Sequence, residues 1–170
     1  DTVLPDSVRI TVTAQDFLPY ESAVPVVFSG AFLRAVSLSI DDSSGGNGDG
    51  LPGPGEIVEV SLEVVNFGNG VAQTVEASLS SSDPMVEVLD GPSFYGDIGG
   101  GMSATGSSSF SISLGPDCPD GHVVALDVDI VSEVPRSVWT GSVSMTVAAP
   151  VLVAEDHAID DAWGGDGDGV

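Results

Sequence analysis

The chain alternates short apolar runs with breaks of glycine, proline and aspartate, and no stretch of it has a convincing helical period. Within most of the runs, Val, Ile and Leu alternate with polar residues, which is typical of strands with one buried face. The runs lie at 8–12, 24–28, 31–40, 56–65, 71–79, 85–89, 107–114, 123–131 and 141–147. This pattern predicts an all-β protein of short strands.

Breaks between the runs indicate antiparallel connections. The segment Asn66–Gly70, NFGNG, is rich in residues that tolerate a positive φ, so we expect it to place 71–79 as an antiparallel neighbour of 56–65. Seven or eight short strands over about 115 residues are typical of an antiparallel, immunoglobulin-like β-sandwich. The Cys…Trp…Cys pattern of antibody domains is absent, so the expectation concerns architecture and not a disulfide.

One acidic, glycine-rich stretch occurs twice. Ile40–Glu56 reads IDDSSGGNGDGLPGPGE, and Ile159–Val170 reads IDDAWGGDGDGV, at an offset of 159 − 40 = 119 residues with eight of twelve aligned positions identical. Self-similarity at a fixed offset indicates a tandem repeat. We therefore expect residues 35–150 to form one complete sandwich and residues 151–170 to begin the next unit.

The first two apolar runs lack a sheet of their own. Residues 1–34 contain a hairpin-like pair of strands, and two strands alone cannot bury an apolar face. We interpret this segment as the closing strands of a preceding unit or as a donor to a neighbouring copy. In the first case adjoining sequence of a covalent array covers the strands. In the second case the head-to-tail contact between copies does not close on itself unless the rotation does, and so it builds a filament.

The acidic stretch predicts a calcium loop. Asn47, Asp49, Gly50 and Glu56 satisfy the [DN]-x-[DN]-G-x₅-E part of a calcium-binding pattern, but its opening position is Gly45. Prolines in the loop and strands on both sides argue against a helix-loop-helix hand, so we expect an aspartate at the preceding strand end to replace the missing carboxylate. The predicted ligands are Asp41, Asp42, Asn47, Asp49 and Glu56.

The second copy offers fewer ligands. Its candidate ligands are Asp160, Asp161, Asp166 and Asp168, and no counterpart of Glu56 comes after them in the sequence. The alternative for the first stretch is a solvated acidic turn that holds no ion, and the alternative for the second is a frayed acidic tail. Recurrence of the Asp-Asp and Gly-Asp-Gly elements at a fixed offset favours calcium, since a solvated turn need not repeat them.

Composition narrows the range of partners. Three Lys+Arg against 26 Asp+Glu give a formal net charge of −23, which repels nucleic acid and anionic membranes and favours divalent cations. The 42% hydrophobic content is ample for a core, and no apolar run approaches the 18 residues of a membrane span. Abundant Asp, Gly and Ser with almost no Lys suit an extracellular or cell-surface setting.

A resemblance supports that setting. The segment ITVTAQDFLPYESAVPV, residues 10–26, resembles the closing segment of the immunoglobulin-like domain that follows the catalytic domain in gingipain-type cysteine peptidases. The sequence after residue 26 resembles the acidic, glycine-rich loops and β-sandwich repeats in C-terminal regions of large secreted bacterial proteins. The resemblance implies a secreted tandem repeat. The resemblance does not extend to the catalytic domain, because nothing around Cys118 or His122 resembles the peptidase active site.

Catalytic and zinc chemistry find little support. Cys118 and His122 lie four residues apart in GPDCPDGH, but no orienting third group or oxyanion element lies beside them in the sequence. One Cys and two separated His, the second being His157, lack the spacing of zinc ligands. We expect a protein that is not an enzyme.

Gly99–Ser109 is expected to be a flexible loop, with O-linked sugars as the alternative.

Three functions remain. We favour a calcium-stabilised structural or adhesive repeat that contacts other copies or adjacent repeats head to tail. A carbohydrate-binding module shares the fold and the calcium, but such modules display aromatic residues on a flat face, and the candidates here are scattered: Phe94, Tyr95, Trp139 and Trp163. The third is a tail domain of a secreted gingipain-type peptidase.

Overall fold

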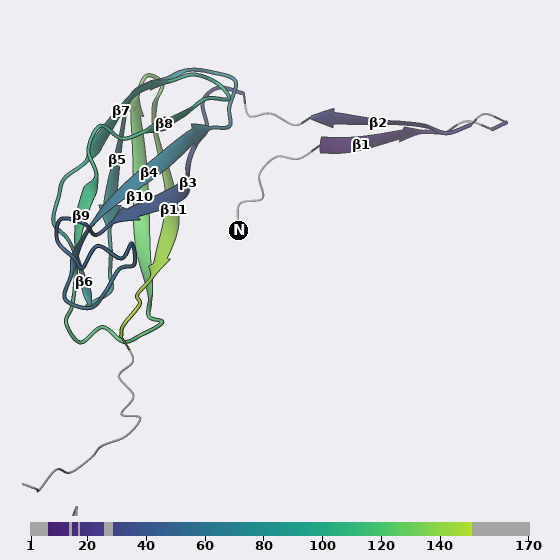
Figure 1. Ribbon diagram of the computed structural model, residues 1–170. Helices are drawn as coiled ribbons and strands as arrows, with labels where there is room; N and C mark the ends of the chain where they lie inside the picture. Colours follow the sequence, from purple (N-terminus) through teal and green to yellow (C-terminus); the bar gives the residue numbers. More distant parts are fainter. Residues whose placement is uncertain (1–6, 14, 17, 26–28, 151–170) are drawn as a thin grey trace, which may run out of the picture.

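The computed structural model describes residues 7–13, 15–16, 18–25 and 29–150 (Figure 1). All regular structure within these residues is β-strand, and the strands form three antiparallel sheets. One sheet has the order β11-β10-β5-β7, which are Arg136–Thr146, Val123–Glu133, Ala72–Ser80 and Ser93–Ile98. A second has the order β3-β4-β9-β6, with β8 also paired to β4; these are Leu33–Asp41, Ile57–Asn66, Phe110–Leu114, Val86–Val88 and Ser103–Thr105.

These two sheets face each other across one hydrophobic core. Along β10 every second residue is buried, from Val124 to Ile130, and along β4 the buried positions run from Val58 to Val64. Alternation of this kind is what two packed sheets require, because successive side chains point to opposite faces. The predicted all-β, antiparallel sandwich is confirmed, and the facing four- and five-stranded sheets fit the immunoglobulin-like expectation.

The predicted pairing across Asn66–Gly70 is wrong. β4 pairs with β3, β8 and β9, whereas β5 pairs with β10 and β7, so the NFGNG segment carries the chain from one sheet to the other. The sequence correctly places a turn at these residues, but the turn connects two sheets and not two paired strands. The buried side-chain amide of Asn66 holds this connection between the sheets in place.

The tract Gly99–Ser109 is not the flexible loop that its composition predicts. It contains β8, whose three residues pair with β4, and Ser109 donates a hydrogen bond from its Oγ to Glu59 Oε2. Strand β7, just before the tract, is also absent from the sequence prediction, because its alternation is interrupted by Gly96 and Asp97. In both cases partners distant in the sequence order a segment whose own composition favours a loop.

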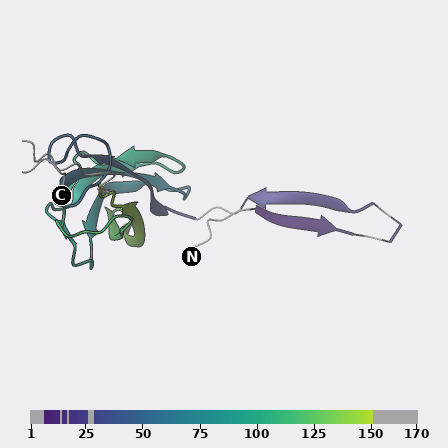
Figure 2. The ribbon, with the colours of Figure 1, turned by 60° about the horizontal axis from the view of Figure 1, so that its bottom comes forward.

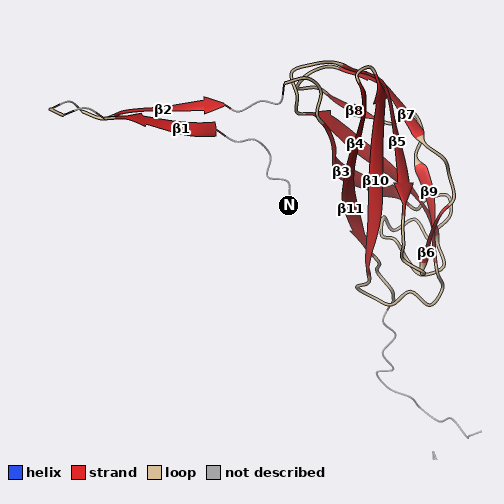
Figure 3. Cartoon of the chain, turned by 180° about the vertical axis from the view of Figure 1, so that it is seen from behind, coloured by secondary structure: helices blue, strands red, loops and turns tan. Residues whose placement is uncertain are grey.

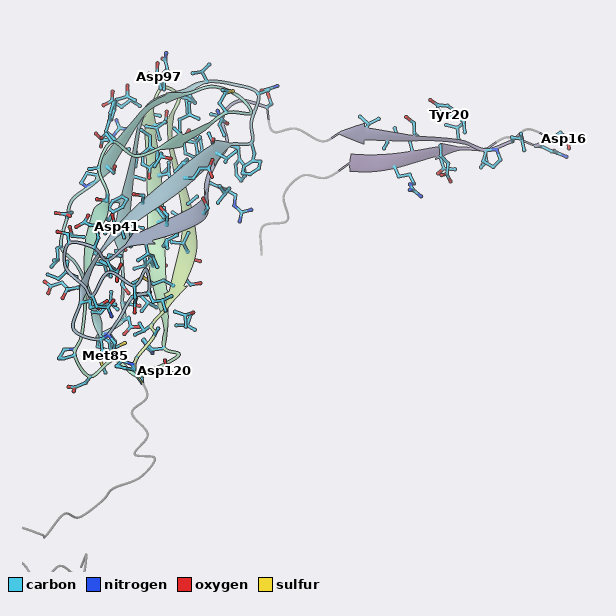
Figure 4. All side chains as sticks on the ribbon, in the orientation of Figure 1. Asp16, Tyr20, Asp41, Met85, Asp97 and Asp120 are labelled. Atoms are coloured by element: carbon cyan, nitrogen blue, oxygen red, sulfur yellow. The ribbon has the colours of Figure 1, made fainter. Side chains whose placement is uncertain are left out.

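The chain enters and leaves the sandwich at opposite ends. β3 begins beside the last residue of β4, at what we call the leading end, and there Leu33 is opposite Asn66. β11 finishes where β10 starts, at the exit end, which Figure 4 marks with Met85 and Asp120; Asp97 labels the opposite end. Within the described residues, no helix is long and apolar enough to cross a membrane.

The first two strands form a separate hairpin. β1 (Ser7–Val12) pairs with β2 (Tyr20–Pro25), and neither strand joins the sheets of the sandwich. Figure 1 and the rotated view of Figure 2 both show the hairpin apart from the sandwich. The sequence predicts a first strand at 8–12, which β1 contains, and a second at 24–28. The observed second strand begins earlier, at Tyr20, and residues 26–28 lie outside the described residues.

Candidate functional site

The acidic loop connects β3 to β4 at the exit end of the sandwich. Its last part packs beside the chain that leaves β11, because the backbone N–H of Ala148 donates to the carbonyl of Pro52 at 2.9 Å. A groove separates the two segments, lined by Asn47, Asp49, Leu51, Gly53, Pro54, Glu56 and residues 148–150. The loop therefore lies at the end of the sandwich where the chain leaves β11.

Asp42 is the centre of the first half of the loop. Its side chain is buried, with 2% of the residue exposed, and its carboxylate accepts three backbone N–H groups. Oδ2 accepts from Gly48 and Asp49 at 3.0 Å each, and Oδ1 accepts from Gly50 at 3.1 Å. Converging N–H groups satisfy a buried carboxylate. Gly48 and Gly50 take positive φ angles of 78° and 82°, which favour glycine at these two positions.

Glu56 closes the second half of the loop in the same way. Its Oε1 accepts the N–H of Asn47 at 3.0 Å, and its Oε2 accepts the N–H of Gly53 at 2.7 Å. A Cβ added to Gly46 would lie 2.9 Å from both the Asp42 Cβ and the Glu56 Cδ. The two carboxylate-bearing side chains thus flank Gly46, and no larger residue fits between them.

The remaining predicted ligands lie around this pair. Asn47 Nδ2 donates to Asp49 Oδ2 at 3.1 Å, and Asp49 Oδ1 accepts the N–H of Leu51 at 2.8 Å. Asp41 is exposed and accepts the N–H of Ser43, and hydrogen bonds from Ser43 lower the pKa of the Asp41 carboxyl. Of the two aspartates that the sequence offers as a replacement for the opening ligand, Asp42 is the one turned into the loop.

The donor set has the chemistry that calcium prefers. Every predicted ligand side chain offers carboxylate or amide oxygen, and no nitrogen or sulfur donor takes part. The residues described by the structure contain no group of three or more His, Cys, Asp or Glu side chains gathered as a metal cluster. The carboxylates of Asp42 and Glu56 accept backbone N–H groups in this structure. Calcium in this loop would have to draw on their remaining lone pairs, on Asn47 and Asp49, and on backbone oxygens or water.

The second predicted site lies outside the described residues. Asp160, Asp161, Asp166 and Asp168 all belong to 151–170, as do His157 and Trp163. The repeat of the acidic loop therefore stays a sequence prediction.

Cys118 and His122 do not form a nucleophile and base pair. His122 Nε2 lies 2.6 Å from Asp83 Oδ2, and in the described part of the chain no hydrogen bond joins the ring to Cys118. Cys118 is buried, and burial together with the negative charge of Asp83 raises the pKa of its thiol. A protonated, enclosed thiol is unreactive. Asp83 stabilises the turn instead, by accepting the Met85 N–H at 2.9 Å.

Sequence reasoning misses a polar centre at the leading end. Asn66 is 0% exposed; its Oδ1 accepts the N–H groups of Phe32 and Gly68, and its Nδ2 donates to the carbonyls of Gly70 and Ile98. These four bonds tie the segment before β3 to two loops. The motif is visible as NFGNG, but its composition indicates only a turn.

Comparisons with known proteins place the chain in no family. No protein-family model matches it, and no curated protein matches it significantly.

Proposed function

We propose that this protein is a structural or adhesive β-sandwich repeat of an extracellular array, stabilised by calcium in its acidic loop. The observation that carries the proposal is the place and construction of that loop. Two carboxylates, Asp42 and Glu56, organise it from inside, and it contacts the segment that leaves the sandwich through the Ala148–Pro52 hydrogen bond. Whatever stiffens the loop also stiffens the connection to the next unit.

Calcium would add positive charge to a loop whose only charged side chains are acidic. Asp41, Asp42, Asp49 and Glu56 lie within sixteen residues, and the described residues of the loop contain no Lys or Arg. Backbone N–H groups satisfy the buried oxygens but supply only partial charge. A bound Ca²⁺ would offset the mutual repulsion of these carboxylates, and its ligands are the predicted residues of this loop.

The architecture favours a linear array. The chain enters at the leading end and leaves at the exit end, so consecutive sandwiches can follow one another without folding back (Figure 1). Each end also has a buried polar side chain that fixes the connecting segment, Asn66 at one and Asp42 at the other.

The described aromatic residues give a glycan-binding module less support. Tyr95 is buried, and its hydroxyl donates to the Leu62 carbonyl at 3.2 Å. Trp139 is half-buried and packs against the core, which leaves Phe94 as the exposed member of the group. A flat sugar platform needs several exposed rings on one face.

Thermal unfolding of the full chain with excess calcium and with EDTA tests the proposal. An ion that binds only the folded state adds RT ln(1 + [L]/Kd), about 2.7 kcal/mol at a hundredfold excess over Kd. We expect the melting temperature to rise with calcium, and to rise much less with magnesium. Asp49→Asn, which keeps the size and one acceptor oxygen of the side chain but removes its charge, should weaken the response.

Asp129→Asn is the matched control, since Asp129 is exposed on the outer face of β10. This variant should keep the full calcium response. Melting curves that are identical in calcium and EDTA would reject a calcium-stabilised repeat. A response that Asp129→Asn reduces as much as Asp49→Asn would show that calcium acts through the net charge and not through the loop.

A further inference from the structure

The β1–β2 hairpin has one apolar face and one polar face. Residues directly opposite each other in an antiparallel pair share a face. Val8 is opposite Val24, Ile10 is opposite Ser22, and Val12 is opposite Tyr20. The other face carries Arg9, Thr11, Glu21 and Ala23, with Arg9 Nη1 3.9 Å from Glu21 Oε2.

Nothing in the described residues covers the apolar face. Between 44% and 66% of each large side chain on it is exposed: Val8, Ile10, Val12, Tyr20 and Val24. Figure 3 shows the hairpin from behind, again apart from both sheets of the sandwich. An isolated two-stranded sheet with such a face is marginally stable in water, so its sequence indicates a covering partner.

The hairpin reproduces the pairing of β10 with β11. Moving β1 forward by 126 − 8 = 118 residues and β2 by 143 − 24 = 119 residues converts its pairs into Leu126–Val143, Val128–Gly141 and Ile130–Trp139. All three are pairs of the β10–β11 ladder. The two offsets differ by one because seven residues, 13–19, connect the first hairpin where eight, 131–138, occupy the equivalent stretch.

The faces correspond as well as the pairs. Leu126, Val128 and Ile130 are buried in the core, and their counterparts Val8, Ile10 and Val12 lie on the apolar face of the hairpin. Trp139 and Val143 pack against the core, where their counterparts are Tyr20 and Val24. A shift of one residue in either strand would send its apolar set to the wrong side, so the agreement fixes which side of each strand corresponds.

The order of elements identifies the partner. After the β10–β11 hairpin, Leu152, Ala154 and Ile159 stand at the same spacing as Leu33, Ala35 and Ile40 after β2. In the sequence, each hairpin thus precedes apolar residues spaced as in 33–40 and then an acidic, glycine-rich stretch. β10–β11 closes the unit that begins at β3, and the first hairpin stands in the same place relative to an earlier unit.

We propose that β1–β2 is the closing hairpin of a preceding sandwich of the same repeat, and that its apolar face covers that sandwich as β10–β11 covers this one. This inference rests on the tandem-repeat function proposed above. β1 then takes the place of β10 beside the preceding unit's counterpart of β5, as β10 lies beside β5 from Asp127 to Val131. A second copy of this chain does not offer the position, since its own β10–β11 occupies it.

A graft within the full chain tests the equivalence. Residues 126–143 are replaced by residues 8–24, which places Val8, Ile10 and Val12 at the core positions of Leu126, Val128 and Ile130. We expect the grafted chain to fold with a single cooperative thermal transition. The matched control replaces 126–143 by residues 9–24, one residue fewer, and brings Arg9 and Thr11 to the positions of Leu126 and Val128. This control should lose the cooperative transition.

Two results would overturn the inference. One is a graft that unfolds no more cooperatively than its shifted control. The other is a full-length chain that sediments as a dimer and becomes monomeric with Ile10→Asp, since a second copy would then cover the face. A monomer whose sandwich melts unchanged with Ile10→Asp supports the inference. These readouts use no calcium, so they fail or succeed separately from the calcium test.

Discussion

At each end of the sandwich a buried polar side chain holds the connecting segments in place, and the two side chains differ in their chemistry. At the leading end the neutral amide of Asn66 accepts two hydrogen bonds and donates two, so its contacts are complete without any charge. At the exit end the carboxylate of Asp42 only accepts, and it does so from three N–H groups. An amide can join carbonyls and amides of several segments, whereas a carboxylate gathers N–H groups and keeps a negative charge.

This difference indicates which end of the sandwich should respond to pH and to divalent ions. The leading end contains a buried polar centre that no proton or cation alters at ordinary pH. The exit end carries the acidic loop and the Asp83–His122 pair, so pH and divalent ions should act there. In the proposed array, changes in pH or calcium concentration would then act on each connection from the exit side.

The largest effect is expected at Asn66. Asn66→Asp keeps the size but removes both donors, and it places a carboxylate beside the carbonyls of Gly70 and Ile98. Each buried group left unpaired costs about 1–3 kcal/mol, so we expect a loss of roughly 3 kcal/mol or more in unfolding free energy. Denaturant unfolding measures it. Asn69→Ala, which removes one exposed bond to Gly30 N–H, is the control and should cost under about 1 kcal/mol.

The next effect concerns Asp42. Asp42→Asn leaves one acceptor oxygen and turns an NH₂ group towards backbone N–H donors, so we expect a loss of about 2 kcal/mol in EDTA. The loss should be larger in calcium, because the variant also gives up the ion. Equal losses in the two solutions would show that Asp42 serves the loop without contacting calcium.

A smaller effect is expected from Gly46→Ala. The added Cβ would lie 2.9 Å from the Asp42 and Glu56 side chains, which would have to move apart. Overpacking of this kind costs about 1–3 kcal/mol. Gly91→Ala is the control, because a Cβ there meets nothing within 4 Å. Similar melting temperatures for the two variants would contradict the tight approach of the two carboxylates.

The smallest effect is expected in acid. The backbone N–H of Met85 and then the His122 side chain lower the pKa of Asp83 below its ordinary 3.8. The resulting stability is complete above the unfolded pKa and is lost as the pH falls through the folded pKa. Unfolding free energy measured from pH 5 down to pH 2 should therefore fall less steeply in Asp83→Asn. A parallel acid slope would exclude Asp83 as a contributor.

Local pattern is sufficient to predict the sandwich but not its pairing. The alternation of β4 and β10 is evident from the sequence, because burial of one face imposes it directly. The passage of the chain from one sheet to the other at Asn66 is not evident from the sequence. NFGNG is typical of a hairpin turn, and only the hydrogen-bond partners at Phe32 and Ile98 show otherwise. Glu56 is predicted as a ligand from its spacing, and Asp42 from its position at the end of the preceding strand. Their flanking of Gly46 depends on the folded loop, which no spacing rule describes.

The opposite placement of the two chain ends determines how the sandwich bears tension. A pull along an array would act at the start of β3 and at the end of β11, and both strands run from the leading end to the exit end. The force would then lie along the strands, and the β3–β4 and β10–β11 ladders would be loaded in shear across all their hydrogen bonds together. Because many hydrogen bonds would have to break together, we expect slow unfolding under force, and the unfolding rate governs forced unfolding.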